Sequence, residues 1–149
     1  MSSDLDFEHI WQWADKIYAK NQTLCLSLQD EHGVNVNLLL LCSYLDSQAR
    51  IYYQPNYWQN IVTELQHWEN KLLTPYRKLR RLSKNLLEQD EYQRMLGVEL
   101  MLERKSQRFI GSLMMTSTIP TGRINGKGNI DNYLSILGIH QQNIKLQLE

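Results

Sequence analysis

The sequence predicts an all-α fold, a single-domain bundle of about five or six helices with a flexible C-terminal segment. Only three prolines occur, and glycines are sparse before Gly122, so long stretches contain no helix breaker. Apolar residues recur at intervals of three and four along most of the chain. The 149 residues match one ordinary domain, which can bury enough surface to fold without disulfides or metals. We expect a helical core domain over residues 1–115, and a linker, a short helix and a tail over 116–149.

The N-terminal third predicts three helices in quick succession. The first begins near Asp4 or Asp6, either of which suits an N-cap. The second runs from about Thr23 to His32 and ends at Gly33, because glycine readily adopts the left-handed conformation. The third follows at once, with Asn35 as its N-cap, and continues to Leu45 or beyond.

Polar residues interrupt the strongest apolar stretch, "LSLQDEHGVNVNLLLLCSYL", between Leu26 and Leu45. They include Gln29, Asp30, Asn35 and Asn37, which would suit a binding site. A tight corner between two helices explains them equally well, since it leaves backbone amides and carbonyls without helical partners. Such groups need side-chain partners when they are buried. We favour the corner.

The rest of the chain predicts a connector and further helices. Residues 46–57 form the connector, and Pro55 opens a helix. Pro75 either kinks this helix or starts a new one after Thr74. A long helix then spans about residues 90–115, and a short one lies near residues 130–137. The apolar face after Pro75 is expected to be formed by Tyr76, Leu79, Leu82 and Leu86.

Composition narrows the class of protein and its compartment. Sixteen basic and sixteen acidic residues cancel, whereas a dedicated nucleic-acid binder usually carries a basic excess. Cys25 and Cys42 lie in leucine-rich segments, which is typical of free, buried thiols in a reducing compartment. The start of the chain has no apolar signal segment, and the longest apolar run, residues 38–42, is too short for a membrane span. We expect a cytoplasmic protein with no membrane partner.

Basic residues gather between positions 71 and 84. Four of them form a candidate basic surface: Lys71, Lys78, Arg81 and Lys84. They could bind phosphate, RNA or an acidic partner, or they could form a solvated helix face. No aromatic residues are interleaved with them, as a platform for single-stranded nucleic acid requires. The solvated face is favoured.

Two pairs of opposite charges suggest a polar network. Glu99 and Glu103 are four residues apart and so share one helix face. Because an isolated buried charge is very costly, Arg77 or Arg80 are the expected partners of these carboxylates. An acid/base dyad or metal ligands would also use paired carboxylates, but an ion-pair network is the favoured interpretation.

Motifs for metals, cofactors and catalysis are weak. Glu64 and His67 match the Glu-x-x-His pattern of di-iron bundles, but those sites need two such motifs. The segment "GRINGKG" departs from the phosphate-loop pattern in spacing and in its last residue. No nucleophile elbow or dinucleotide fingerprint occurs. We predict no metal, no cofactor and no catalytic residue, and favour a protein that is not an enzyme.

Three segments, "LSLQDEHGVNVNLLLLCSYL", "LLTPYRKLRRLSK" and "GVELMLER", resemble in order a small proteobacterial family catalogued as domain of unknown function 2390. The likeness covers about residues 7–105. A family pattern of proline and two arginines matches Pro75, Arg77 and Arg80, and its paired glutamates match Glu99 and Glu103. A tryptophan often stands in the family where this chain has Leu45. The resemblance implies a helical, cytoplasmic bacterial protein and supplies no activity.

The resemblance directs attention to six residues that could converge as one buried polar network. This candidate polar cluster comprises Gln29, Asp30, Arg77, Arg80, Glu99 and Glu103.

Three functions fit the sequence. The first is a non-enzymatic accessory protein that binds another protein. Its candidate contacts include exposed aromatic side chains, Trp13, Tyr52, Tyr53 and Tyr57. The second is an enzyme or binding protein for an anionic metabolite, in which the two arginines hold the anion and a glutamate acts as acid or base. The third and least favoured is an RNA- or ribosome-associated factor that uses residues 71–84. Homo-oligomerisation is left open.

Overall fold

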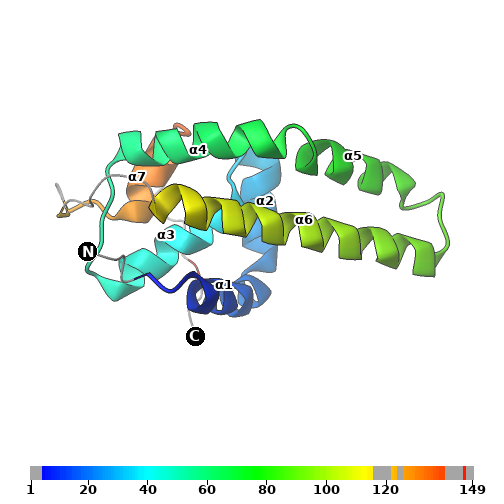
Figure 1. Cartoon of the computed structure of the whole chain (residues 1–149), viewed down its shortest axis with the longest axis horizontal. Helices are drawn as coiled ribbons and strands as arrows, with labels where there is room; N and C mark the ends of the chain where they lie inside the picture. Colours follow the sequence, from blue (N-terminus) through cyan, green and yellow to red (C-terminus); the bar gives the residue numbers. More distant parts are fainter. Residues whose placement is uncertain (1–4, 116–121, 124–125, 140–145, 147–149) are drawn as a thin grey trace. The chain divides into compact units, whose positions relative to one another are not determined.

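The computed structural model describes residues 5–115, 122–123, 126–139 and 146. These residues form seven helices and no strand, which confirms the all-α prediction with a slightly higher helix count. The helices are α1 Phe7–Lys20, α2 Gln22–His32, α3 Val36–Gln48, α4 Pro55–Glu69, α5 Leu73–Ser83, α6 Gln89–Met115 and α7 Asn129–Ser135 (Figure 1). Much of the predicted linker and tail lies outside the described residues.

The chain divides into two compact units. The first comprises Met1–Gln59 with Thr118–Glu149, and the second comprises Asn60–Ser117. In the first unit α3 packs against α1, α2 and α7. Four consecutive leucines of α3, at positions 38–41, are buried, with at most 3% of their surface exposed. Because α7 packs on α3, part of the C-terminal segment belongs to the core of this unit.

The polar stretch between α2 and α3 is a tight corner. Gly33 adopts the left-handed conformation (φ 68°), and the Val34 amide donates to the Leu28 carbonyl at 3.2 Å. The Asn35 side chain caps α3 by accepting from the Leu38 amide at 3.2 Å. The Asn35 amide in turn donates to the Tyr133 hydroxyl of α7 at 2.8 Å. Capping therefore accounts for part of this polar stretch, as predicted. The hydrogen bond to Tyr133 was not predicted.

Two predicted helix starts are confirmed, and one is displaced. Asp6 caps α1 by accepting from the His9 amide at 3.2 Å, and Pro55 is the first residue of α4. The break before α5 falls earlier than Thr74, because α4 ends at Glu69 and α5 begins at Leu73. Pro75 thus lies in the first turn of α5, where no amide is needed for a bond within the helix.

The connector between α3 and α4 is buried. Tyr52, Tyr53 and Tyr57 are only 8%, 6% and 7% exposed, so the prediction that they are exposed contacts was wrong. The rings of Tyr53 and Tyr57 stack at 3.9 Å, and both meet Trp58 edge-on. Trp13 is half-buried, and its ring lies edge-on to that of Tyr44.

In the second unit, α5 and α6 form an antiparallel hairpin connected by residues 84–88 (Figure 1). The apolar face predicted after Pro75 was wrong for its three leucines, whereas Tyr76 is partly buried against α6. Leu79, Leu82 and Leu86 are 53%, 66% and 83% exposed. The side chains that α5 directs at α6 are instead largely polar.

Both cysteines are free and buried in the first unit. Burial raises the pKa of the Cys25 thiol, and it raises the pKa of Cys42 well above its ordinary range, with a further contribution from the negative charge of Asp46. Such thiols are poor nucleophiles, because the thiolate is the reactive form.

None of the helices in the described part of the chain combines the length and the apolar character that a membrane span requires.

Candidate functional site

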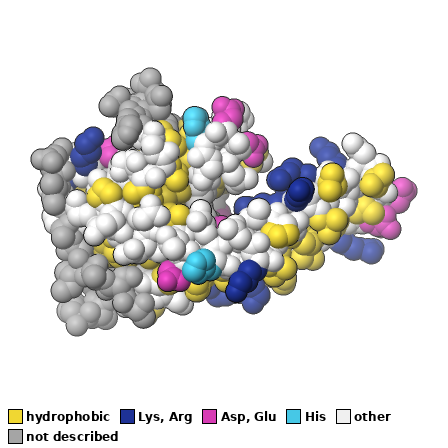
Figure 2. Space-filling model, turned by 90° about the horizontal axis from the view of Figure 1, so that it is seen from above, with side chains coloured by type: hydrophobic (Ala, Val, Ile, Leu, Met, Phe, Trp, Pro, Cys, Tyr) yellow, Lys and Arg dark blue, Asp and Glu magenta, His cyan; other side chains and the backbone are white. Residues whose placement is uncertain are grey.

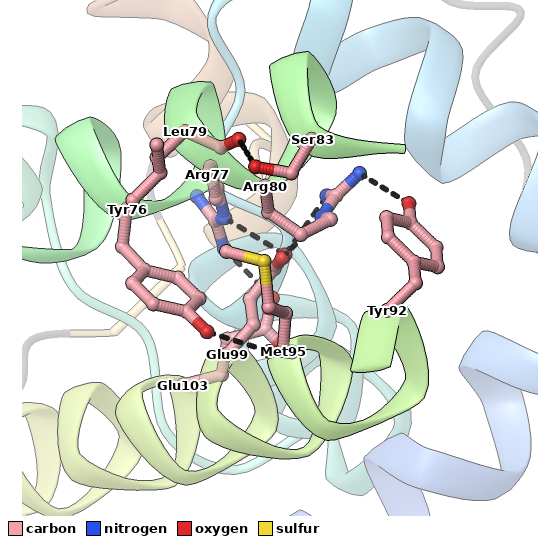
Figure 3. A network of polar contacts seen from close by, with 9 residues as sticks. All are labelled: Tyr76, Arg77, Leu79, Arg80, Ser83, Tyr92, Met95, Glu99 and Glu103. Carbon is pink, nitrogen blue, oxygen red and sulfur yellow. Dashed lines mark hydrogen bonds and ion pairs between the residues drawn. The ribbon is translucent and has the colours of Figure 1, made fainter. Parts of the chain in front are cut away.

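Four charged side chains meet between α5 and α6. Arg77 and Arg80 come from α5, and Glu99 and Glu103 come from α6 (Figure 3). On each helix the two residues are three or four positions apart, so they share one face. We call these four residues the arginine–glutamate cluster.

The pairing within the cluster is direct. Arg80 binds Glu99 through two parallel hydrogen bonds, Nε to Oε1 at 2.6 Å and Nη2 to Oε2 at 3.2 Å. Arg77 donates from Nη2 to Glu103 Oε2 at 2.9 Å, and its Nε lies 3.5 Å from Glu99 Oε2. The two-point geometry of Arg80 and Glu99 is the strongest form of such a pair.

Burial makes these contacts structurally important. The side chains of Arg77 and Arg80 are 21% and 20% exposed, and that of Glu99 is 11% exposed. Removing one member of such a pair strands a poorly solvated charge, which costs about 3–5 kcal/mol when burial is complete. The cluster thus makes the register of α5 against α6 sensitive to each of its members.

Two tyrosines extend the network, and the sequence analysis did not place them in it. The Tyr76 hydroxyl donates to the Met95 carbonyl of α6 at 2.9 Å. Arg80 Nη1 donates to the Tyr92 hydroxyl at 3.4 Å. The signal was available in the spacing, since Tyr76 precedes Arg80 by one helical turn and so lies on the same side of α5.

The electrostatics of the cluster favour fixed protonation states. The hydrogen bonds that Arg80 donates to the Glu99 carboxylate raise the pKa of the guanidinium further above its already high value. Burial raises the pKa of the Tyr76 hydroxyl, and the negative charge of Glu99 adds to this shift. Both groups therefore stay protonated at neutral pH, and neither is tuned to exchange a proton there.

The charge balance limits what the cluster can bind. Two guanidinium groups face two carboxylates, so the four side chains carry no net charge. An anionic ligand would have to displace a glutamate that is already well placed. The arrangement is therefore better suited to joining two helices than to holding a metabolite.

The other predicted polar residues lie in the first unit. On α2, Gln29 is half-buried and Asp30 is exposed. The structure thus brings together four of the six residues of the candidate polar cluster, and the convergence of all six stays a prediction.

The candidate basic surface is solvent-exposed. Lys78 and Arg81 lie on α5, Lys71 precedes this helix and Lys84 follows it. Leu79, Leu82 and Leu86, which were predicted to be buried, are exposed in the same segment of the chain. Figure 2 shows yellow hydrophobic and dark blue basic side chains side by side along the α5–α6 hairpin, at the right of the picture. We call Leu72, Leu79, Leu82 and Leu86 the leucine row; they are 51%, 53%, 66% and 83% exposed.

A second polar network, which sequence reasoning missed, lies in the first unit. The Asp46 carboxylate of α3 accepts from the Asn129 amide at 2.7 Å, from the Asn129 side chain at 3.1 Å and from the Ile130 amide at 3.1 Å. The Asn129 side chain also bonds the backbone of Ile51 and Tyr53, both at 2.8 Å. These contacts attach the start of α7 to α3 and to the connector.

Gly128 fits this second network because it has no side chain. A Cβ atom at this position would lie 2.8 Å from Asp46 Oδ2, closer than real Cβ atoms come to other groups. Gly128, the last residue of the segment that departs from the phosphate-loop pattern, therefore has a structural role. The one signal in the sequence was a glycine directly before an asparagine at a helix start.

Within the part of the chain that the structure describes, no group of three or more histidine, cysteine, aspartate or glutamate side chains could hold a metal ion. The donor set of the arginine–glutamate cluster does not suit a cation either, because both of its carboxylates are engaged by arginines.

The fold and the cluster define a small all-α protein whose second unit contains an ion-paired helical hairpin. The chain belongs to the family described as "Protein of unknown function (DUF2390)", whose model matches residues 9–110. This match confirms the resemblance seen in the sequence. No curated protein and no solved structure matches the chain. The matched region contains the whole arginine–glutamate cluster and ends before α7.

Proposed function

We propose that this protein is a non-enzymatic accessory protein that binds another protein through the outer side of its α5–α6 hairpin. The observation that carries the proposal is the leucine row, in which exposure reaches 83% at Leu86. Large apolar side chains gathered on one surface are a common mark of a protein-binding site.

The arginine–glutamate cluster supports this proposal indirectly. It uses the inward side of α5 for polar pairing, whereas Leu79 and Leu82 of that helix are exposed. A segment that keeps its ion pairs inside and the leucine row outside gives up burial energy that its own sequence could supply, at about 25 cal/mol per Å² of apolar surface. Binding a partner would recover that energy.

We also propose the cytoplasm as the compartment. Two free, buried thiols, Cys25 and Cys42, fit a reducing environment. They supply no reactive centre, since burial raises the pKa of both.

The experiment that tests the proposed function is site-specific photo-crosslinking in the cells from which the chain comes. A photoreactive phenylalanine derivative replaces Leu82 in the leucine row or, as the matched control, exposed Glu31 on α2. We expect discrete protein adducts at position 82 and none at position 31. The proposal is wrong if position 82 gives no adduct or gives the same adducts as position 31.

A ligand screen tests the competing metabolite function on the same protein. The unfolding midpoint of wild type and of Arg80→Ala is measured with anionic metabolites, nucleotides and metal ions at matched salt. We expect no compound to raise the midpoint of wild type alone. A compound that does so would identify the arginine–glutamate cluster as a ligand site, because a ligand of the native state stabilises it by mass action.

A further inference from the structure

The leucine row has the spacing of a coiled-coil seam. Leu72, Leu79 and Leu86 are seven residues apart, and Leu82 lies three positions after Leu79. In a heptad these are three a positions and one d position, with Pro75 at the other d position. Leu79 and Leu82 lie on α5 itself, Leu72 is its N-cap and Leu86 lies in the turn that follows it.

Cations accompany this seam. Lys71 and Lys78 each precede a leucine at an a position and therefore occupy g positions. In coiled coils, charges at g pair with opposite charges on the facing helix and determine which partner is accepted. Arg81, also exposed, directly precedes Leu82.

Negative charge is missing along the same segment. Residues 71–87 contain six lysines and arginines and no aspartate or glutamate. The two arginines of the arginine–glutamate cluster are neutralised by α6, which leaves Lys71, Lys78, Arg81 and Lys84 exposed. The surface beside the leucine row is therefore distinctly positive.

We propose that the leucine row binds an amphipathic helix of a partner protein that carries leucine-like residues at its a and d positions and glutamates beside them. This inference rests on the proposed function and specifies the chemistry of the partner. An apolar stripe on the partner would cover the leucines, and its carboxylates would pair with Lys71 and Lys78. The binding mode is the docking of one amphipathic helix along another.

Charge argues against self-association. A second copy of this chain would bring its own g-position lysines to the seam, and like charges facing one another are unfavourable.

The test uses a synthetic probe and the full chain. The probe is a fluorescent peptide of three heptads with leucine at a and d and glutamate at e and g. One control peptide has the same composition in shuffled order, and another has lysine in place of each glutamate. Binding is followed by fluorescence anisotropy to wild type, Lys78→Glu, the Leu79→Gln/Leu82→Gln double variant and, as a matched control, Lys16→Glu on the exposed side of α1.

We expect the acidic probe to bind wild type and Lys16→Glu equally, and the shuffled peptide not to bind. Lys78→Glu should weaken binding of the acidic probe by at least about tenfold, because it places like charges together, and should improve binding of the lysine peptide. The leucine double variant should lose the probe. Circular dichroism should show the helix content and unfolding midpoint of wild type in all variants.

Several results would overturn the inference. These are no binding of the acidic probe, equal binding of the shuffled peptide, or no effect of Lys78→Glu. Dimers in sedimentation velocity that the leucine double variant abolishes would assign the row to self-association. Binding of phosphatidylglycerol vesicles that is lost in the double variant would assign it to a membrane. Discrete crosslinks at position 82 without peptide binding would leave the proposed function standing and reject this partner chemistry alone.

Discussion

The Asp46 network of the first unit joins segments that are distant in sequence, whereas the arginine–glutamate cluster of the second joins two consecutive helices, and their surroundings also differ. Around the Asp46 network the apolar side chains are inside, and Tyr53, Tyr133 and Leu134 are at most 6% exposed. Around the arginine–glutamate cluster, two leucines of α5, Leu79 and Leu82, and the flanking Leu72 and Leu86 are more than half exposed.

This difference separates two uses of buried polar groups. In the first unit, hydrogen bonds to one carboxylate satisfy the backbone at the start of α7 while the leucines of α3 form the core. In the second, ion pairs replace apolar contacts on the inward side of α5, and the leucines that could have made them are outside. A feature that lowers the stability of the isolated chain is better explained by binding than by folding.

The largest expected effect lies in the first unit. Asp46→Ala removes an acceptor shared by two amides and one side chain, and should lower the free energy of unfolding by about 4 kcal/mol. Urea denaturation followed by far-ultraviolet circular dichroism measures the change. The control is Asp30→Ala on exposed α2, which should cost no more than about 0.5 kcal/mol. A large cost at Asp30 would support its predicted place in a buried network.

The arginine–glutamate cluster should come next. Arg80→Ala strands the Glu99 carboxylate and should cost about 3 kcal/mol, whereas Arg81→Ala on the exposed side of α5 should cost little. Replacing both Arg80 and Glu99 with leucine should recover most of that loss, because no charge is then left without its partner. If Arg80→Ala and Arg81→Ala have equal effects, the cluster does not hold the hairpin together.

Tyr76→Phe should have a smaller effect that depends on pH. Loss of the hydrogen bond to Met95 should cost about 1 kcal/mol at neutral pH. The pKa of Tyr76 is raised in the folded protein, so its contribution is complete below about pH 10, the value for an unfolded tyrosine, and is lost as pH rises through the folded pKa. The difference between wild type and variant should thus shrink in alkaline solution. A difference that is constant from pH 7 to 11 would contradict this explanation.

Helix type and the α2–α3 corner were predictable because local rules determine them. The Asp6 and Asn35 caps, the left-handed Gly33 and the helix start at Pro55 all depend on neighbouring residues. The pairing of Arg77 and Arg80 with Glu99 and Glu103 was predictable from spacing and the cost of unpaired charge.

Burial that depends on tertiary contacts was not predictable. The leucines of α5 follow a helical period, but a period does not say which side faces the neighbouring helix. The tyrosines of the connector are buried by groups such as Asn129, which lies 76 residues after Tyr53. Local patterns carry no information about such distant pairs.

The central claim is that the segment around α5 has its ion pairs inside and the leucine row outside. The free energy of unfolding of a leucine-row variant tests this claim most directly. Leu79→Gln/Leu82→Gln/Leu86→Gln keeps good helix formers on α5 and should change the free energy of unfolding by less than about 1 kcal/mol. Leu41→Ala on α3, which removes a fully buried side chain, should cost about 3 kcal/mol in the same urea titration. A triple variant as unstable as Leu41→Ala would place the leucines in the core and contradict the account of this surface.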